Sequence, residues 1–182
     1  MMNCRAIVLV ISFLFCLSIR VTAQKSVSEL PPSQTAVLQQ FLTEHKGLEF
    51  LSETVTDKSI LKDMRKTFGV NFRPFYRAGD FNHDGVADFA MILAKEGGPT
   101  GDQGEGIAET HRKLYDMTVV IFNGVGKTYR PAFIKTTKAP RACFLNTTNE
   151  KRKRLTFGVY ETDDGFVMTP AGKVYIIENG DK

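Results

Sequence analysis

Residues 117–122 read Met-Thr-Val-Val-Ile-Phe, a run of β-branched and aromatic side chains that is typical of a β-strand. Beyond Gly69, similar short runs alternate with turn residues, which predicts a mainly antiparallel sheet. Asp163-Asp164-Gly165 carries the Asp-Gly signal of a tight hairpin turn. The expected strands are Phe75–Ala78, Asp88–Leu93, Met117–Phe122, Thr128–Ile134, Leu155–Tyr160, Gly165–Thr169 and Lys173–Ile177.

Before Gly69 the apolar side chains recur at helical spacing and predict two helices. Ser33 is the expected N-cap of the first helix and Gly47 its end, whereas Asp57 caps the second and Gly69 ends it. The apolar stripes are Ala36, Val37, Phe41 and Leu42 in the first helix and Ile60, Leu61, Met64 and Phe68 in the second. Helices followed by strands predict an α+β fold, with two N-terminal helices packed on one face of a mainly antiparallel sheet.

The first 23 residues have the three parts of a cleavable signal peptide. Arg5 stands alone in an n-region without acidic residues, the apolar run 6–17 follows, and Val21-Thr22-Ala23 gives a small-x-small cleavage site before Gln24. The apolar run is shorter than the roughly 20 residues that span a bilayer, although an uncleaved anchor is the alternative. We therefore expect a single domain over 24–182, located in the periplasm or secreted, without membrane insertion after cleavage.

Charge and cysteine content narrow the class of partner. The 24 basic and 20 acidic residues give a small positive net charge, which does not favour nucleic-acid binding. The run Lys151-Arg152-Lys153-Arg154 is expected to be a solvated turn between strands. Of the three cysteines, only Cys143 lies beyond the predicted signal, so no disulfide forms within the mature chain, and Cys143 is expected to be a buried small hydrophobe.

The stretch Asp80-Phe81-Asn82-His83-Asp84-Gly85-Val86-Ala87-Asp88 places oxygen-bearing side chains at positions 1, 3, 5 and 9 of a loop. Calcium prefers about six to eight oxygen ligands, and a chain that wraps an ion turns alternate side chains inward. Gly85 supplies the sharp turn, and the carbonyl of Val86 is the expected backbone ligand. His83, at an even position, is expected to point to solvent.

Residues 78–90 resemble the FG-GAP or VCBS repeat, in which a loop between two strands holds calcium, and their Asp-x-Asn-x-Asp-Gly core is similar to EF-hand and dockerin loops. The resemblance implies a Ca²⁺ site. An EF-hand would carry Glu where Met91 stands, so a strand-loop-strand arrangement is favoured, as one repeat unit within another fold, as in small exported bacterial proteins of unassigned role. A turn held by Asx side chains without metal is the alternative. The implied ligands are the side chains of Asp80, Asn82, Asp84 and Asp88 and the carbonyl of Val86.

Three functions fit the sequence. The favoured one is a non-catalytic exported module with a structural calcium loop that binds a protein or glycan partner. A periplasmic inhibitor or accessory protein of a secreted hydrolase is the second. A small hydrolase is the third, with an acid and a base supplied by Glu105, Glu109 and His111 of the Gly-rich segment 96–113. No metal-ligand spacing of histidines and no nucleophile elbow supports the enzyme.

Overall fold

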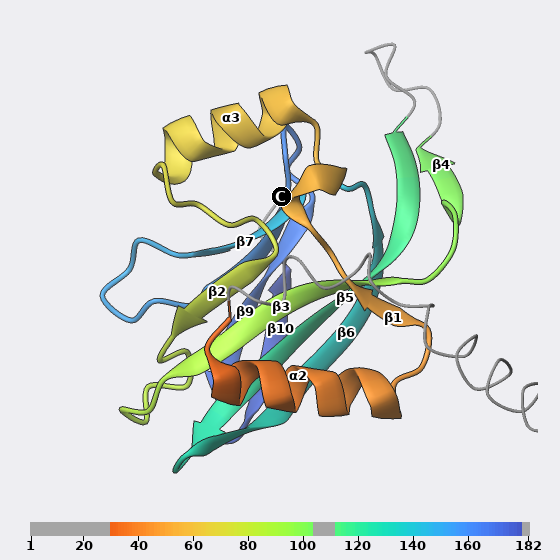
Figure 1. Ribbon diagram of the computed structural model, residues 1–182. Coiled ribbons are helices and arrows are strands. Elements are labelled where there is room, and N and C mark those ends of the chain that lie inside the picture. Colours follow the sequence, from red (N-terminus) through yellow and green to blue (C-terminus); the bar gives the residue numbers. More distant parts are fainter. Residues whose placement is uncertain (1–29, 104–111, 180–182) are drawn as a thin grey trace, which may run out of the picture.

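A computed structural model of the protein describes residues 30–103 and 112–179 (Figure 1). The predicted signal peptide and the candidate side chains Glu105, Glu109 and His111 lie outside these residues. In chain order the elements are α2 (Pro32–Glu44), β1 (Leu48–Phe50), the 3₁₀ turn η3 (Glu53–Val55), α3 (Lys58–Phe68), β2 (Tyr76–Gly79), β3 (Asp88–Lys95), β4 (Gly101–Gln103), β5 (Arg112–Val125), β6 (Thr128–Ala139), β7 (Cys143–Thr147), β8 (Leu155–Val159), β9 (Gly165–Ala171) and β10 (Val174–Asn179).

The first sheet is antiparallel and is organised around β3 and β5, which pair along their centres. On the free edge of β3, strands β1 and β2 lie end to end: β1 pairs with 93–95 and β2 with 88–91. Strand β5 is the longest of the described strands and pairs with β3 over 117–122, with β6 over 115–125 and with β4 over 112–114.

The second sheet is antiparallel in the order β10-β9-β8-β7. The hairpin between β8 and β9 turns through Tyr160–Asp164, with Gly158 and Gly165 as the last pair. The expected turn position is therefore confirmed, but the tight Asp-Gly turn is wrong because the connection is longer. Gly165 is required where it stands, since a Cβ there would collide with the Phe157 carbonyl oxygen.

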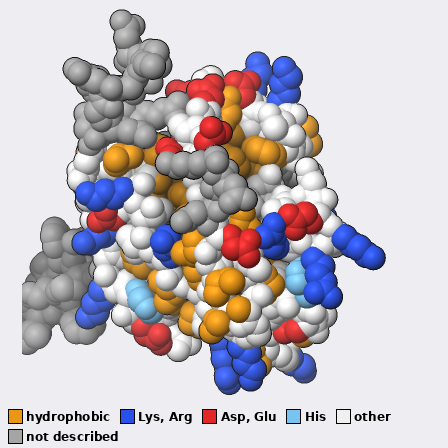
Figure 2. Space-filling model, turned by 180° about the vertical axis from the view of Figure 1, so that it is seen from behind, with side chains coloured by type: hydrophobic (Ala, Val, Ile, Leu, Met, Phe, Trp, Pro, Cys, Tyr) orange, Lys and Arg blue, Asp and Glu red, His pale blue; other side chains and the backbone are white. Residues whose placement is uncertain are grey.

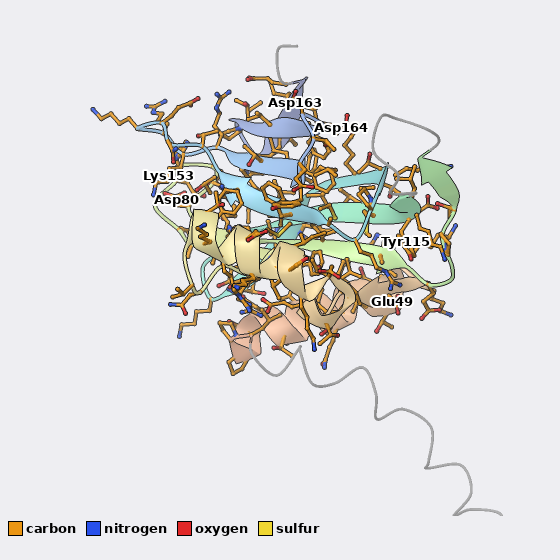
Figure 3. The ribbon with its side chains drawn as sticks, turned by 90° about the horizontal axis from the view of Figure 1, so that it is seen from above. Glu49, Asp80, Tyr115, Lys153, Asp163 and Asp164 are labelled. Carbon is orange, nitrogen blue, oxygen red and sulfur yellow. The ribbon has the colours of Figure 1, made fainter. Side chains whose placement is uncertain are left out.

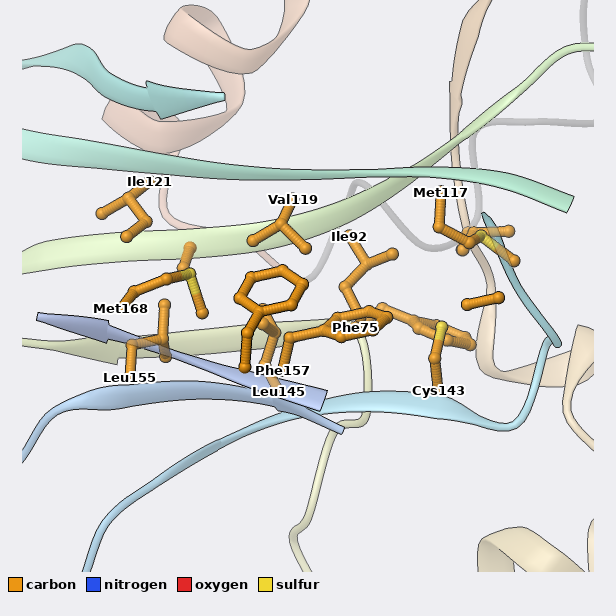
Figure 4. Packing of buried hydrophobic residues seen from close by; sticks show 14 of the residues in the cluster. Phe75, Ile92, Met117, Val119, Ile121, Cys143, Leu145, Leu155, Phe157 and Met168 are labelled. Atoms are coloured by element: carbon orange, nitrogen blue, oxygen red, sulfur yellow. The ribbon is translucent and has the colours of Figure 1, made fainter. Parts of the chain in front are cut away.

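The main core lies between the two sheets (Figure 4). Side chains alternate across a strand, so β3 and β5 turn one set inward and the other outward. The inward set includes Ile92, Val119 and Ile121, which face Leu145, Leu155, Phe157 and Met168 of the second sheet. Fully burying a side chain of this size contributes about 1.5–3 kcal/mol, so this interface supplies much of the driving force for folding.

Helix α2 covers the outward set on the opposite face of the first sheet. Leu38 and Phe41 pack there, with the Phe41 ring edge-on to Phe122 at 5.3 Å between centroids. Gln34 is buried and accepts a 3.0 Å hydrogen bond from the Tyr76 hydroxyl. The first sheet is thus buried on both faces, and residues 89–94 of β3 are all buried. The other α2-facing side chains are Phe89, Met91, Leu93 and Val120.

Helix α3 lies apart from α2 (Figure 1) and packs beside the second sheet. As expected, Asp57 caps it by accepting the Ser59 N–H at 2.7 Å, and Gly69 ends it at φ +107°. Its last residue, Phe68, stacks on Phe72 at 4.6 Å and meets Phe144 of β7 at 5.2 Å. Within residues 30–103 and 112–179, no helix is both long and apolar enough to cross a membrane.

The expected α+β fold is wrong, because the protein is mostly β, with two antiparallel sheets packed face to face. Helices α2 and α3 do not form one layer on a single sheet. The face of the first sheet that borders the main core is covered by the second sheet and not by helices. The physical reason is that strand periodicity does not reveal which sheet a strand joins.

On the rear of the molecule, basic and acidic side chains are interspersed, with hydrophobic ones in small groups between them (Figure 2).

Candidate metal centre

The predicted calcium loop connects β2 to β3, whose pair Gly79 and Asp88 closes its base. Gly85 has φ +85° and His83 has φ +61°, so the chain passes twice through the left-handed region. Glycine adopts this region freely, whereas a side chain there is strained. Two such residues let the loop turn sharply enough to bring its polar side chains inward. His83 is exposed, as expected.

Three oxygen-bearing side chains are gathered by the N–H groups of this turn. The two carboxylate oxygens of Asp80 accept the N–H of Asp84 at 3.1 Å and of Gly85 at 3.0 Å. The side-chain oxygen of Asn82 also accepts the Asp84 N–H, at 3.0 Å, and its amide donates to Asp84 at 2.9 Å. Asp84 in turn accepts the Val86 N–H at 2.8 Å. The structure thus brings Asp80, Asn82 and Asp84 together.

Asp88 is placed differently. Its side chain is fully buried, and one carboxylate oxygen accepts the N–H of Phe81 at 2.8 Å and of Asn82 at 3.3 Å. The other accepts the N–H of Gly124, on β5, at 2.8 Å. Burial raises the pKa of this carboxyl above its ordinary value, while the three N–H groups act in the opposite direction. Asp88 therefore fastens the start of the loop to the sheet.

The loop also packs on the end of β5. A Cβ on Gly124 would collide with the carbonyl oxygen of Ala87 and with the Val86 side chain. Only glycine at position 124 allows the loop to lie close enough to β5 for the Gly124 N–H to reach the Asp88 carboxylate. The neighbouring Val125 and Thr128 form the last pair of the β5–β6 hairpin, whose turn contains Gly126 at φ +62°.

A buried polar pair beside the loop was not foreseen from the sequence. The Tyr175 hydroxyl, on β10, donates a 2.8 Å hydrogen bond to the side-chain oxygen of Asn123 on β5. Burial, followed by the negative charges of Asp88, Asp84 and Asp80, raises the pKa of Tyr175, so its hydroxyl remains a donor. This hydrogen bond joins the second sheet to the strand that anchors the loop. Its residues lie too far along the chain from the motif for spacing to reveal them.

Other chemically capable side chains are engaged in structure. Cys143 is completely buried, as expected, and burial raises the pKa of its thiol to about 12. His45 stacks on Phe41 at 3.9 Å. Arg154, in the predicted basic turn, pairs with Glu150 and with Glu178 of β10. Among the described residues, no three or more His, Cys, Asp or Glu side chains converge closely enough to hold a metal ion.

A comparison with protein-family models finds no match, and comparisons with curated proteins and with solved structures find none that is significant.

Proposed function

We propose that this protein is an exported, non-catalytic module that binds one Ca²⁺ ion in the loop 80–88 and a partner in the periplasm or outside the cell. The observation that carries the metal proposal is the gathering of Asp80, Asn82 and Asp84 by the N–H groups of residues 84–86. Export is proposed from residues 1–23, whose sequence has the charge, apolar run and cleavage pattern of a signal peptide.

The donor set suits calcium better than other common metals. It contains two carboxylates and one amide oxygen, with the Val86 carbonyl as the proposed backbone ligand, and it lacks the imidazole and thiolate donors that favour zinc or copper. Two exposed carboxylates so close together repel each other, and a divalent cation between them removes that cost. Water completes the six to eight oxygens that the ion requires.

We assign Asp88 the role of positioning the loop. Its carboxylate is fully buried and accepts N–H groups from both the loop and β5, whereas the side chains of Asp80 and Asp84 are exposed, so the sequence-based expectation that Asp88 binds the ion directly is replaced here by a supporting role. A buried, ionised carboxylate behind the ligands also adds negative potential at the site. The proposed ligands are therefore Asp80, Asn82, Asp84 and the Val86 carbonyl.

A non-catalytic role is supported by the architecture of the loop. The side chains of Asp80, Asn82 and Asp84 are held in place by one another and by backbone N–H groups, which suits a structural ion site. The loop extends from the edge of a packed sandwich (Asp80 in Figure 3). Binding energy in such a site stabilises the fold, and recognition of a partner falls to the exposed surfaces.

The test is thermal unfolding of chelator-treated protein as calcium is added. Calcium loops of extracellular modules bind at roughly 10⁻⁴–10⁻³ M, and a hundredfold excess over the dissociation constant adds about 2.7 kcal/mol to the free energy of unfolding. We expect the midpoint to rise with millimolar calcium, less with magnesium, and hardly at all in Asp84→Asn. Asp163→Asn is the matched control, because Asp163 is exposed and lies away from Asp80 (Figure 3). A wild-type midpoint indifferent to calcium would leave the loop as a metal-free turn.

A further inference from the structure

The outer face of α3 forms a shallow groove of about 440 Å³ that the calcium loop does not share. Figure 3 looks down on α3, and no described element crosses over it. The residues that line the groove follow one stripe along the helix and the chain just beyond it: Lys58, Leu61, Lys62, Arg65, Lys66 and Val70. The surface thus combines two apolar side chains, Leu61 and Val70, with a rim of cationic side chains.

The apolar part is open to a ligand. Val70 is 80% exposed, the highest value among the exposed large hydrophobic side chains of the described residues. Leu61 is half-buried and lines the same groove as Lys58 and Lys62. Arg65 also lines the groove, and its guanidinium is held in place by an ion pair with Glu53 at 2.6 Å.

The three lysines of the rim have no acidic partner in the described part of the chain. The carboxylates that are close to these lysines in the sequence are engaged elsewhere: Asp57 caps α3, Glu53 pairs with Arg65, and Asp63 accepts a hydrogen bond from Tyr160. Lysines four residues apart on one helix repel each other, and Lys58 in the first turn also opposes the helix dipole. An anionic ligand would relieve both costs.

We propose that this groove binds an acidic segment of a partner polypeptide. Lys58, Lys62 and Lys66 recur every four residues, so their Cα atoms follow one another at about 6 Å along the helix. A partner helix with Glu at every fourth position repeats at the same distance, and an aliphatic side chain beside each Glu covers Leu61 and Val70. This is the charge-paired packing of helices with acidic and basic flanks.

The shape of the groove favours a peptide over other anions. A flat lipid surface meets the lysine heads, whereas the half-buried Leu61 is covered best by a side chain that projects toward it. A sulfated or uronic glycan satisfies the lysines but supplies no aliphatic side chain. The proposal goes beyond the proposed function, and because α3 and the loop 80–88 are separate, either can fail without the other.

The experiment measures fluorescence anisotropy of a labelled synthetic peptide of about four helical turns, with Glu at every fourth position and Leu beside each Glu. We expect the exported protein to bind it, with affinity that falls as salt rises. Lys62→Glu should weaken binding by about fivefold or more, since it replaces an attraction by a repulsion. Lys173→Glu, on the exposed turn before β10, is the matched control and should bind as the wild type does.

Three further arms decide between partners. Leu61→Ser should weaken binding of the Leu-bearing peptide and leave an Ala-substituted peptide unaffected. Binding should persist in a calcium chelator. The proposal is overturned if the peptide does not bind, if Lys173→Glu weakens binding as much as Lys62→Glu, or if a chelator abolishes binding. It is also overturned if phosphatidylglycerol vesicles or heparin bind more tightly than the peptide in a Lys62-dependent manner.

Discussion

The buried carboxylate of Asp88 accepts a 2.8 Å hydrogen bond from the backbone N–H of Gly124, which ties the first residue of β3 to the end of β5. The other oxygen of the same carboxylate holds the N–H groups of Phe81 and Asn82. One side chain therefore fixes both the start of the candidate metal loop and the strand on which that loop rests.

Replacing Asp88 by Asn should lower the free energy of unfolding by about 2–4 kcal/mol at neutral pH. The amide NH₂ then faces a backbone N–H, so hydrogen bonds to a charged acceptor are lost and a buried donor is left unsatisfied. Urea unfolding in chelator measures the effect. Asp84→Asn is the control, because Asp84 is exposed and should leave the metal-free protein nearly as stable. Equal losses in the two variants would contradict the anchoring role.

The stability difference between wild type and Asp88→Asn should also depend on pH. Burial raises the folded-state pKa of Asp88 above 3.8, so the folded protein holds this proton more tightly than the unfolded chain. The protonated Asp88 therefore adds to the free energy of unfolding. This contribution is fully present below pH 3.8 and is lost as the pH rises through the raised pKa of the folded state. Relative to Asp88→Asn, which cannot titrate, the wild type should therefore lose stability as pH rises through that window. Denaturant unfolding at a series of pH values, without calcium, measures the difference, and a constant difference would contradict the raised pKa.

Gly124→Ala should destabilise the protein by about 1–3 kcal/mol, because its Cβ collides with the backbone of Ala87 and with Val86. The same displacement moves the loop and should weaken calcium binding, if the loop holds calcium as proposed. Gly98→Ala is the matched control, since a Cβ there meets nothing within 4 Å. Isothermal calorimetry and thermal melts of both variants provide the two readouts. A Gly124→Ala variant as stable as Gly98→Ala would mean that the loop does not rest on β5.

Tyr175→Phe should lower the free energy of unfolding by about 1–3 kcal/mol, because the buried oxygen of Asn123 loses its partner. Since the pKa of Tyr175 is raised, this residue should contribute no tyrosinate absorbance while the protein is folded. Alkaline titration of the wild type and the variant should thus give the same folded-state amplitude. A smaller amplitude in Tyr175→Phe would show that the hydroxyl is accessible to base.

Cys143 should resist thiol reagents in the native protein, because it is completely buried and its pKa is raised to about 12. Labelling of the protein should become complete only in denaturant. The rate of labelling at intermediate denaturant then reports opening of the core between the sheets. Rapid labelling of the native protein would contradict this packing.

Local signals in the sequence were reliable where neighbouring residues decide the structure. As predicted, α3 begins after its N-cap Asp57 and ends at Gly69. Such signals are reliable because an N-cap and a glycine with positive φ act on the residues next to them in the sequence. The short strands β1 and β4 were not predicted from the sequence, because three residues are too few to show an alternating pattern. The unbroken apolar run 89–94 could have indicated a strand covered on both faces, which is how β3 lies.

The arrangement of sheets and the supports of the loop lay beyond the reach of the sequence. Alternation shows that Leu155–Val159 is half-buried but does not reveal that it faces β3 and β5 across a second core. The motif likewise places oxygen-bearing side chains at regular positions, but it does not show which of these oxygens accept hydrogen bonds from backbone N–H groups. Asp88 is bound by a glycine 36 residues away, and only the folded chain brings the two together.

The end-to-end placement of β1 and β2 on one edge of β3 has an evolutionary consequence. The chain leaves that edge after Phe50 and returns to it at Tyr76, and the register of each strand is set by its own pairs with β3. The intervening segment, which carries α3, is therefore an excursion whose length does not enter the pairing. Substitutions on the exposed side of α3 can therefore change the proposed partner-binding groove without altering the strand register of the sandwich.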